Sequence, residues 1–75
     1  MDLQSINEAI EYLSERDKNF LINFGTDPVL RKFLSAERIK ICNKLVKLGL
    51  MCKGTSDDKH KNVVYYVDTF IYNKL

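Results

Sequence analysis

The chain has no tryptophan, one proline, one histidine, two cysteines and three glycines among its 75 residues. With so few residues that punctuate the backbone, we do not expect long loops. Two cysteines cannot build the dense disulfide framework of a small secreted domain. This scarcity points to a reduced, cytoplasmic setting, which would be the host cell's for a viral protein.

Long apolar runs are also missing. No stretch approaches the roughly 20 residues that a membrane-spanning helix needs. The first five residues carry neither a basic nor an apolar leader segment, so we expect no secretory signal and no membrane partner. Apolar residues at 45% and charged residues at 29% are ordinary globular values. We therefore expect residues 1–75 to form a single domain.

Charge is distributed unevenly along the chain. Residues 1–27 carry six acids against two bases, whereas residues 28–75 carry ten bases against four acids. The second part is therefore strongly basic, although the whole chain is only +2. Such a polarised chain can present a basic face to a polyanion. Two solvated surfaces that merely differ in charge are the alternative.

The N-terminal third has helical periodicity. Residues 5–8 fit a capping box, and apolar residues recur at helical spacing over residues 6–24. Ser14 offers a second helix start, so this stretch is either one bent helix or two short ones. Gly25 is expected to end it as a left-handed C-cap.

Two further helices are predicted next. Thr26-Asp27-Pro28 is a start signal for a short helix over residues 28–34. Ser35 is the expected N-cap of a longer helix that runs to Leu48 and closes at Gly49. One uninterrupted helix over residues 28–48 is the alternative, and we favour the break. The expected inward face of the longer helix consists of Ile41, Cys42, Leu45 and Leu48.

The period then changes from helical to alternating. Residues 50–53 are short and strand-like, residues 54–62 have turn composition, and residues 63–67 are β-branched and aromatic. These features predict a β-hairpin. The residues expected to face the core are Leu50, Cys52, Val63, Tyr65 and Val67, and Tyr66 is expected to be exposed. The apolar segment 69–75 is expected to fold back onto the first helix or to make a dimer contact.

This order of elements resembles a winged helix-turn-helix domain. The residues that carry the resemblance are Leu34-Ser35 at the turn, Leu45-Val46-Lys47-Leu48-Gly49-Leu50-Met51 at the end of the longer helix, and residues 53–59 and 64–66 in the hairpin. It covers roughly residues 28–68. It implies an α+β fold, mostly α, with three or four helices followed by a two-stranded wing.

The resemblance implies a small sequence-specific double-stranded DNA-binding protein, a transcription regulator with its recognition helix at 35–48 and its wing at 53–62. Glu37 could accept from cytosine, and Arg38 or Lys40 could donate to guanine. Basic groups further along would meet phosphates. The candidate DNA-binding residues are Ser35, Glu37, Arg38, Lys40, Lys44, Lys47, Lys53, Lys59, His60 and Lys61.

A protein-interaction winged helix is the second hypothesis. Under it, the chain is a small phage or viral protein that docks on a host factor. A homodimer through the N-terminal helix and the residues Phe70, Ile71 and Tyr72 is compatible with either hypothesis. Asp57 and Asp58 in the hairpin loop count against close phosphate contact there.

Other functional classes find little support. Two cysteines and His60 fall short of the four ligands of a structural zinc site, and no catalytic motif is present. We therefore expect no metal, no cofactor and no enzymatic activity. Readers of left-handed nucleic acid also use winged helices, but that resemblance would require a Tyr where Lys47 follows Asn43.

Overall fold

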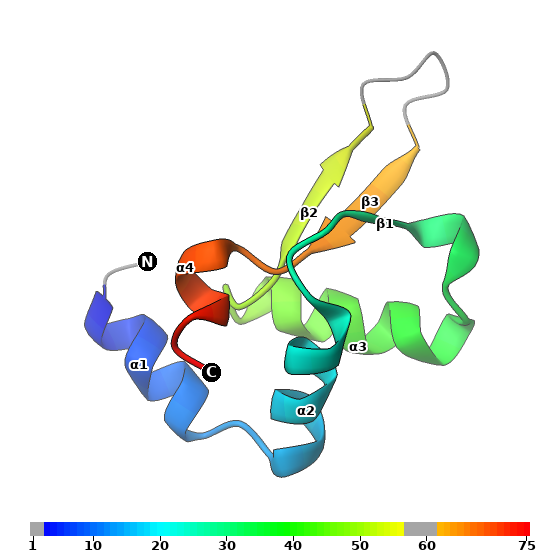
Figure 1. Cartoon of the computed structure of the whole chain (residues 1–75). Helices are drawn as coiled ribbons and strands as arrows, with labels where there is room; N and C mark the ends of the chain where they lie inside the picture. The colour runs from blue at the N-terminus through cyan, green and yellow to red at the C-terminus, as the bar shows by residue number, and fades with distance from the viewer. Residues whose placement is uncertain (1–2, 57–61) are drawn as a thin grey trace.

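The computed structural model describes residues 3–56 and 62–75 of the chain. Its fold is α+β and mostly α, with one three-stranded antiparallel sheet (Figure 1). In chain order the elements are α1 Leu3–Glu11, α2 Glu15–Phe24, β1 Val29–Leu30, the 3-10 helix η1 Arg31–Phe33, α3 Ala36–Lys47, β2 Cys52–Thr55, β3 Val63–Tyr66 and α4 Thr69–Tyr72.

The N-terminal third forms two short helices. Ser14 caps α2, because its side-chain oxygen accepts from the backbone N–H of Asp17 at 3.1 Å. This local bond starts a new helix and separates α2 from α1. The capping box predicted at residues 5–8 is wrong, because α1 begins at Leu3 and Ser5 lies inside it.

Gly25 ends α2 at the predicted position and with a positive φ of 80°, but the predicted left-handed helical conformation is wrong. Its ψ of −175° sends the chain away in an extended direction that residues with a side chain avoid. The Gly25 N–H donates to the Leu21 carbonyl, and the Gly25 carbonyl accepts from the Val67 N–H, both at 3.2 Å. Gly25 therefore ties the end of α2 to the base of the sheet.

The short helix predicted over residues 28–34 is wrong. Val29 and Leu30 form β1 and pair with Tyr65 and Val64 of β3, and only the single 3-10 turn η1 follows. Val29 is β-branched and comes directly after a proline, so it adopts extended backbone readily. The free edge of β3 supplies hydrogen-bonding partners that the local sequence signal could not include.

The longer helix is separate, as predicted. The Ser35 side chain accepts from the Arg38 N–H at 3.2 Å and caps α3, so one continuous helix over 28–48 is excluded. Cys42 and Leu45 are fully buried on its inner face, and Ile41 is partly buried. Leu48 was expected to be inside but is 40% exposed, because its spacing from Leu45 turns it about 60° away, to the edge of the inner face.

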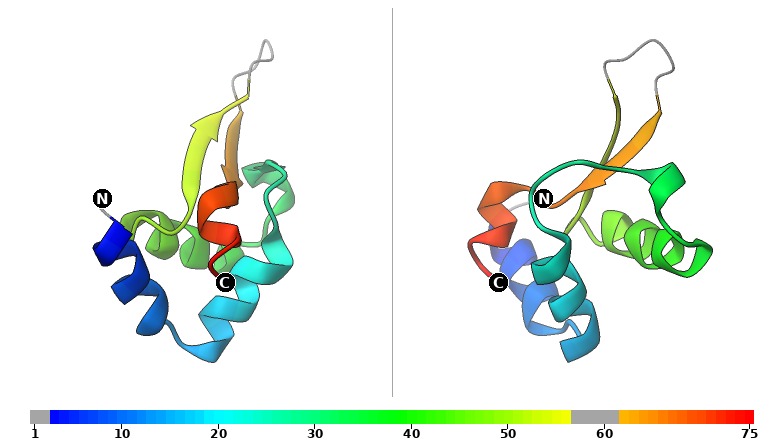
Figure 2. Two further views of the ribbon diagram at one scale, coloured as in Figure 1. Left: turned by 60° about the vertical axis from the view of Figure 1, so that its left-hand side comes forward. Right: turned by 45° about the vertical axis from the view of Figure 1, so that its right-hand side comes forward.

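β2 and β3 form the predicted hairpin, which projects away from the helices (Figures 1 and 2). Strand pairing runs from Cys52 opposite Tyr66 to Thr55 opposite Val63. The Ser56 N–H then donates to the Asn62 carbonyl at 2.8 Å. The hairpin is therefore paired as far as residues 56 and 62, and its loop is shorter than the predicted loop over residues 54–62. β2 also begins two residues later than predicted.

The core lies where α2, α3 and the sheet meet α4. Leu21, Cys42, Leu45, Leu50, Tyr65 and Val67 are fully buried, and Met51, Val64 and Ile71 nearly so. Leu50, Tyr65 and Val67 were predicted correctly, whereas Cys52 and Val63 are only half-buried, and Tyr66 is half-buried rather than exposed.

The apolar C-terminal segment folds back as expected. It forms α4, which lies beside α1 (Figures 1 and 2). Asp68 caps α4 by accepting from the Phe70 N–H at 2.9 Å. In residues 3–56 and 62–75, no helix is long and apolar enough to cross a membrane.

Candidate nucleic-acid interface

The outward face of α3 has four exposed residues in a row, Ala36, Lys40, Asn43 and Lys47. They recur at intervals of three and four residues, which places them on one side of the helix. Their side lies opposite Cys42 and Leu45, which fill the core. We call Lys40, Asn43 and Lys47 the α3 stripe. It offers only two cations and an amide to a partner.

Tyr65 of β3 connects the α3 stripe to the hairpin. Its hydroxyl donates to the Asn43 side-chain oxygen at 2.7 Å. The Lys53 ammonium of β2 lies 5.9 Å from the centre of the same ring. Lys53 and Asn43, which belong to different elements, thus both lie next to the buried Tyr65 side chain.

This arrangement fixes the chemistry of Asn43. Because the amide oxygen accepts from Tyr65, the amide NH2 group is left to donate outward. The α3 stripe and Lys53 therefore present hydrogen-bond donors together, which suits phosphate oxygens and the acceptor atoms of bases. Sequence analysis missed Asn43 as a site residue; its position between two outward lysines was the available signal.

Two predicted site residues of α3 face α2 instead. Lys44 forms an ion pair with Asp17 at 2.8 Å, and the Asp17 side chain is only 11% exposed. Glu37 pairs with Arg16 at 3.2 Å, with both side chains 76% exposed. The start of α2 thus holds this flank of α3 through one base and one acid, and Lys44 already has a carboxylate partner within the fold.

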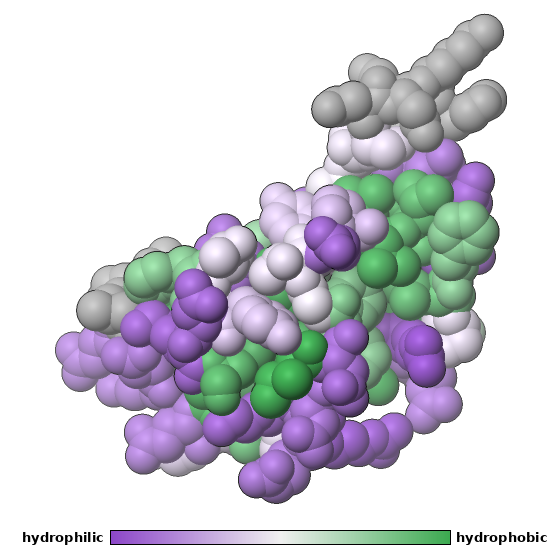
Figure 3. Space-filling model, in the orientation of Figure 1, coloured by the Kyte–Doolittle hydropathy of each residue, from purple (hydrophilic) through white to green (hydrophobic). Residues whose placement is uncertain are grey.

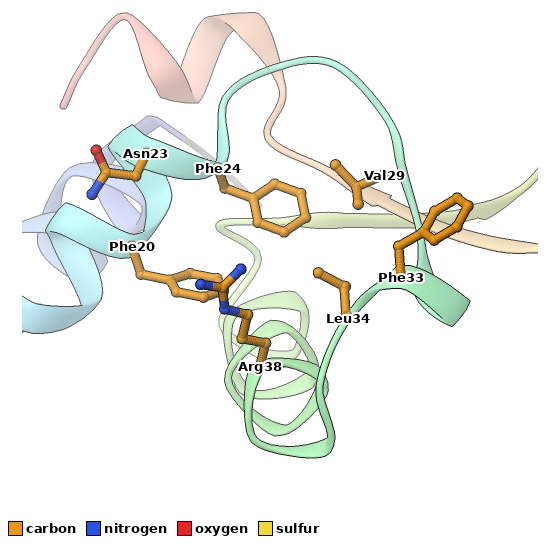
Figure 4. A pocket seen from close by; sticks show the side chains of 7 residues that line it. All are labelled: Phe20, Asn23, Phe24, Val29, Phe33, Leu34 and Arg38. Carbon is orange, nitrogen blue, oxygen red and sulfur yellow. The ribbon is translucent and has the colours of Figure 1, made fainter.

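Ser35 and Arg38 also lie off the α3 stripe. The Ser35 hydroxyl caps α3, as described above. Arg38 lies about two and a half turns before Lys47, on the opposite side of the helix. Its side chain lines a hollow beside Phe20 and Leu34 (Figure 4). The structure therefore does not bring Arg38 together with Lys40 and Lys47.

Basic groups that were not predicted lie on η1. Arg31 and Lys32 are exposed and line a hollow of about 400 Å³ together with Ile39 of α3 and Asn62 and Val63 at the far end of β3. This hollow lies between η1, α3 and the hairpin. The signal in the sequence was a basic pair directly before the predicted turn, but the wrong helix assignment hid its position.

The predicted wing residues divide into two groups. Lys53 is exposed on β2, and its ammonium lies next to the Tyr65 ring. Lys59, His60 and Lys61 lie outside the described residues. Of the four predicted DNA-binding residues of the hairpin, Lys53 is therefore the one that the structure describes.

The two cysteines are free thiols that are buried or half-buried in the fold. Burial raises the pKa of Cys42 to about 11. A thiol with such a pKa is almost entirely protonated near neutral pH, which makes it a poor nucleophile. Within residues 3–56 and 62–75, no three potential metal ligands come together.

Comparisons with protein-family models, with curated proteins and with solved structures find no match for this chain.

Proposed function

We propose that this chain is a winged-helix domain that binds double-stranded DNA in a sequence-specific manner and regulates transcription. In this proposal α3 enters the major groove with the α3 stripe toward the bases, and the hairpin of β2 and β3 acts as the wing. Lys40, Asn43, Lys47 and Lys53 carry the contacts, with Arg31 and Lys32 at the flank.

The order of the elements supports the fold assignment. A single-turn helix, η1, precedes the longer α3 across the turn at Leu34 and Ser35, and the hairpin follows α3 directly. β1 adds a third strand at the base of the hairpin. A helix that is exposed along one side and followed by a projecting hairpin matches how such domains present a recognition helix and a wing.

The observation that carries the proposal is the contact of Tyr65 with both Asn43 and Lys53. It brings an outward residue of α3 and a lysine of β2 to the same tyrosine, which supports a DNA-binding surface that includes both elements. Ammonium groups on this surface would neutralise phosphates, and such contacts supply most of the affinity of a DNA-binding protein. The Asn43 amide and Lys40 would donate to base acceptors, such as O6 and N7 of guanine.

Fluorescence anisotropy with labelled duplexes over a series of salt concentrations tests the proposal. We expect the logarithm of the binding constant to fall linearly with the logarithm of salt concentration, because bound phosphates release counterions. Lys47→Gln should weaken binding and lower the magnitude of the slope by about 0.9, the value for one phosphate contact. Lys74→Gln, on the C-terminal segment, is the matched control and should behave as wild type.

Sequence specificity is tested by selection from a randomised duplex library. An enriched sequence that wild type binds more tightly than random duplex, and that Asn43→Ala no longer distinguishes, supports a regulator. Absence of binding to any duplex at low salt rejects the DNA-binding proposal altogether.

A further inference from the structure

A second surface of the molecule combines an apolar interior with a basic edge. It is a hollow of about 360 Å³, within the usual range for ligand pockets, of roughly 300 to 1,000 Å³. α2, β1, η1 and the start of α3 surround it (Figure 4). We call it the aromatic hollow, and its lining residues are Phe20, Asn23, Phe24, Val29, Phe33, Leu34 and Arg38.

The walls of the aromatic hollow are suited to a large apolar side chain. The rings of Phe20 and Phe24 contact each other with centres 5.7 Å apart. Phe33 is 73% exposed at the edge, an unfavourable place for a phenyl ring in water. Apolar residues also gather around the sheet and η1 on the face shown in Figure 3. A partner side chain inserted between these rings would bury apolar surface on both molecules.

The lining of the aromatic hollow carries positive charge. Arg38 is its one charged lining residue, and within the described chain it takes part in neither of the two ion pairs. The neighbouring carboxylate of Glu37 is already paired with Arg16. Lys32 adds a second cation, because its ammonium lies 5.5 Å from the centre of the Phe33 ring. The edge therefore complements a carboxylate.

The aromatic hollow lies apart from the α3 stripe, although Lys32 belongs both to its edge and to the flank of the proposed DNA surface. Arg38 and Lys47 point to opposite sides of α3, as their spacing requires. DNA phosphates would match the cations of the edge but would leave the Phe20 and Phe24 walls without a partner. An acidic peptide with an aromatic anchor matches both the cations and the walls.

We propose that the aromatic hollow binds an acidic segment of a partner protein, with one aromatic side chain inserted beside Phe20, Phe24 and Phe33 and an adjacent carboxylate on Arg38. In this arrangement the arginine makes a charge-assisted hydrogen bond, and the phenyl rings supply apolar contact. The same chain could then hold DNA on one side of α3 and a protein on the other.

Anisotropy with a fluorescein-labelled peptide that has one central Phe flanked by Asp and Glu tests the proposal. We expect wild type to bind it, and to bind two control peptides at least tenfold more weakly. One control has Ser in place of Phe, and the other has Asn and Gln in place of the acids. Amide resonances of Phe20, Asn23 and Phe24 should shift on titration with the first peptide.

Matched variants assign the binding to this hollow. Arg38→Gln and Phe33→Ala should each weaken peptide binding about tenfold, the loss typical of one charged hydrogen bond or one exposed aromatic anchor. Lys74→Gln and Tyr12→Ala change a cation of the C-terminal segment and an exposed tyrosine, neither of which lines the hollow, and should bind as wild type.

Three outcomes overturn the proposal. The first is that the peptide does not bind. The second is that the amide-substituted peptide binds equally well, or that Arg38→Gln leaves the affinity unchanged. The third is that Arg38→Gln and Phe33→Ala reduce affinity for duplex DNA and not for peptide, which would make the hollow part of the nucleic-acid surface.

Discussion

At the scale of single residues, side chains of one type perform different tasks on α3. Lys44 lies 2.8 Å from Asp17, a residue that is only 8% exposed, whereas Lys47 has no ion-pair partner in the described chain. Their position only three residues apart gives no hint of this difference. Tertiary contact with the acidic start of α2 decides it.

This difference predicts a contrast in stability. Lys44→Met should lower the free energy of unfolding by about 1 kcal/mol, because it leaves the nearly buried Asp17 carboxylate without its cation, while the exposure of Lys44 screens part of the interaction. Lys47→Met should change stability by less than about 0.5 kcal/mol, as is usual for exposed positions. Urea denaturation of both variants measures the contrast. Equal losses would show that the Lys44 pair contributes nothing to the fold.

The two cysteines should differ in reactivity. Cys42 has a pKa raised to about 11, so little thiolate forms near neutral pH. It is also fully buried, so an alkylating reagent cannot reach it in the folded protein. Cys52 is half-buried on β2. We expect iodoacetamide at pH 8 to modify Cys52 alone in the folded protein and both thiols in urea, as measured by mass spectrometry. Modification of Cys42 at the same rate as Cys52 would contradict this structure.

The raised pKa of Cys42 also predicts how the stability of the fold changes with pH. A thiol whose pKa is higher in the folded state stabilises the fold fully below its ordinary pKa, near 9.0, and this contribution is lost as pH rises toward about 11. The expected loss of stability therefore lies between pH 9 and 11.

Part of the candidate site could be predicted from single residues and their spacing. Helical periodicity correctly placed Lys40, Lys44 and Lys47 outside the core. It could not reveal which lysine is paired with Asp17, since that contact joins residues far apart in the sequence. Asn43 was missed for the same reason, because its significance depends on Tyr65 of β3.

At the scale of elements, the sequence predicted a helix start correctly where the interaction that forms it joins neighbouring residues. Ser14 and Ser35 cap their helices through bonds three residues away, and both helix starts could be recognised in the sequence. Residues 28–34 failed because β1 pairs with β3, which is more than thirty residues later in the chain. Pro28 can precede a helix or an extended residue equally well. Residues 29 and 30 form a strand because the open edge of β3 offers them hydrogen-bonding partners.

Gly25, at the end of α2, and Gly54, inside β2, give a matched test. Gly25→Ala should lower the free energy of unfolding by about 1 to 3 kcal/mol, because its φ of 80° and ψ of −175° form a region that is nearly exclusive to glycine. Open space around this position makes backbone strain the sole cause. Gly54→Ala should be nearly neutral, because its added methyl group would lie 3.8 Å from Val64, an ordinary contact. Thermal and urea denaturation distinguish the two variants, and equal effects would argue against strain at Gly25.

At the scale of the whole molecule, the charge asymmetry of the sequence becomes a spatial arrangement. Asp17 and Arg16 at the start of α2 pair with Lys44 and Glu37 on one flank of α3, whereas Lys40 and Lys47 take part in no ion pair among the described residues. The α3 stripe faces one side, and Arg38 faces the other. The two proposed surfaces are therefore consequences of how α2 packs against α3.

The C-terminal segment completes the fold by returning to α1. Ile71 is only 6% exposed and belongs to the core, whereas its neighbour Phe70 is 53% exposed. A second copy of the chain could therefore contact Phe70, but Ile71 is occupied within its own chain. This distinction bears directly on the expected homodimer.

Ile71→Ala should lower the free energy of unfolding by about 3 kcal/mol, through lost burial and the cavity left behind. In a small domain, whose total stability is about 5 to 15 kcal/mol, this loss would move the urea midpoint far toward zero. Phe70→Ala should move the midpoint much less, since 53% of this residue is already exposed. If Phe70 forms a dimer contact, sedimentation equilibrium should show weaker self-association for Phe70→Ala alone. A large stability loss for Phe70→Ala at monomeric concentrations would instead mean that the C-terminal segment packs against the core in another register.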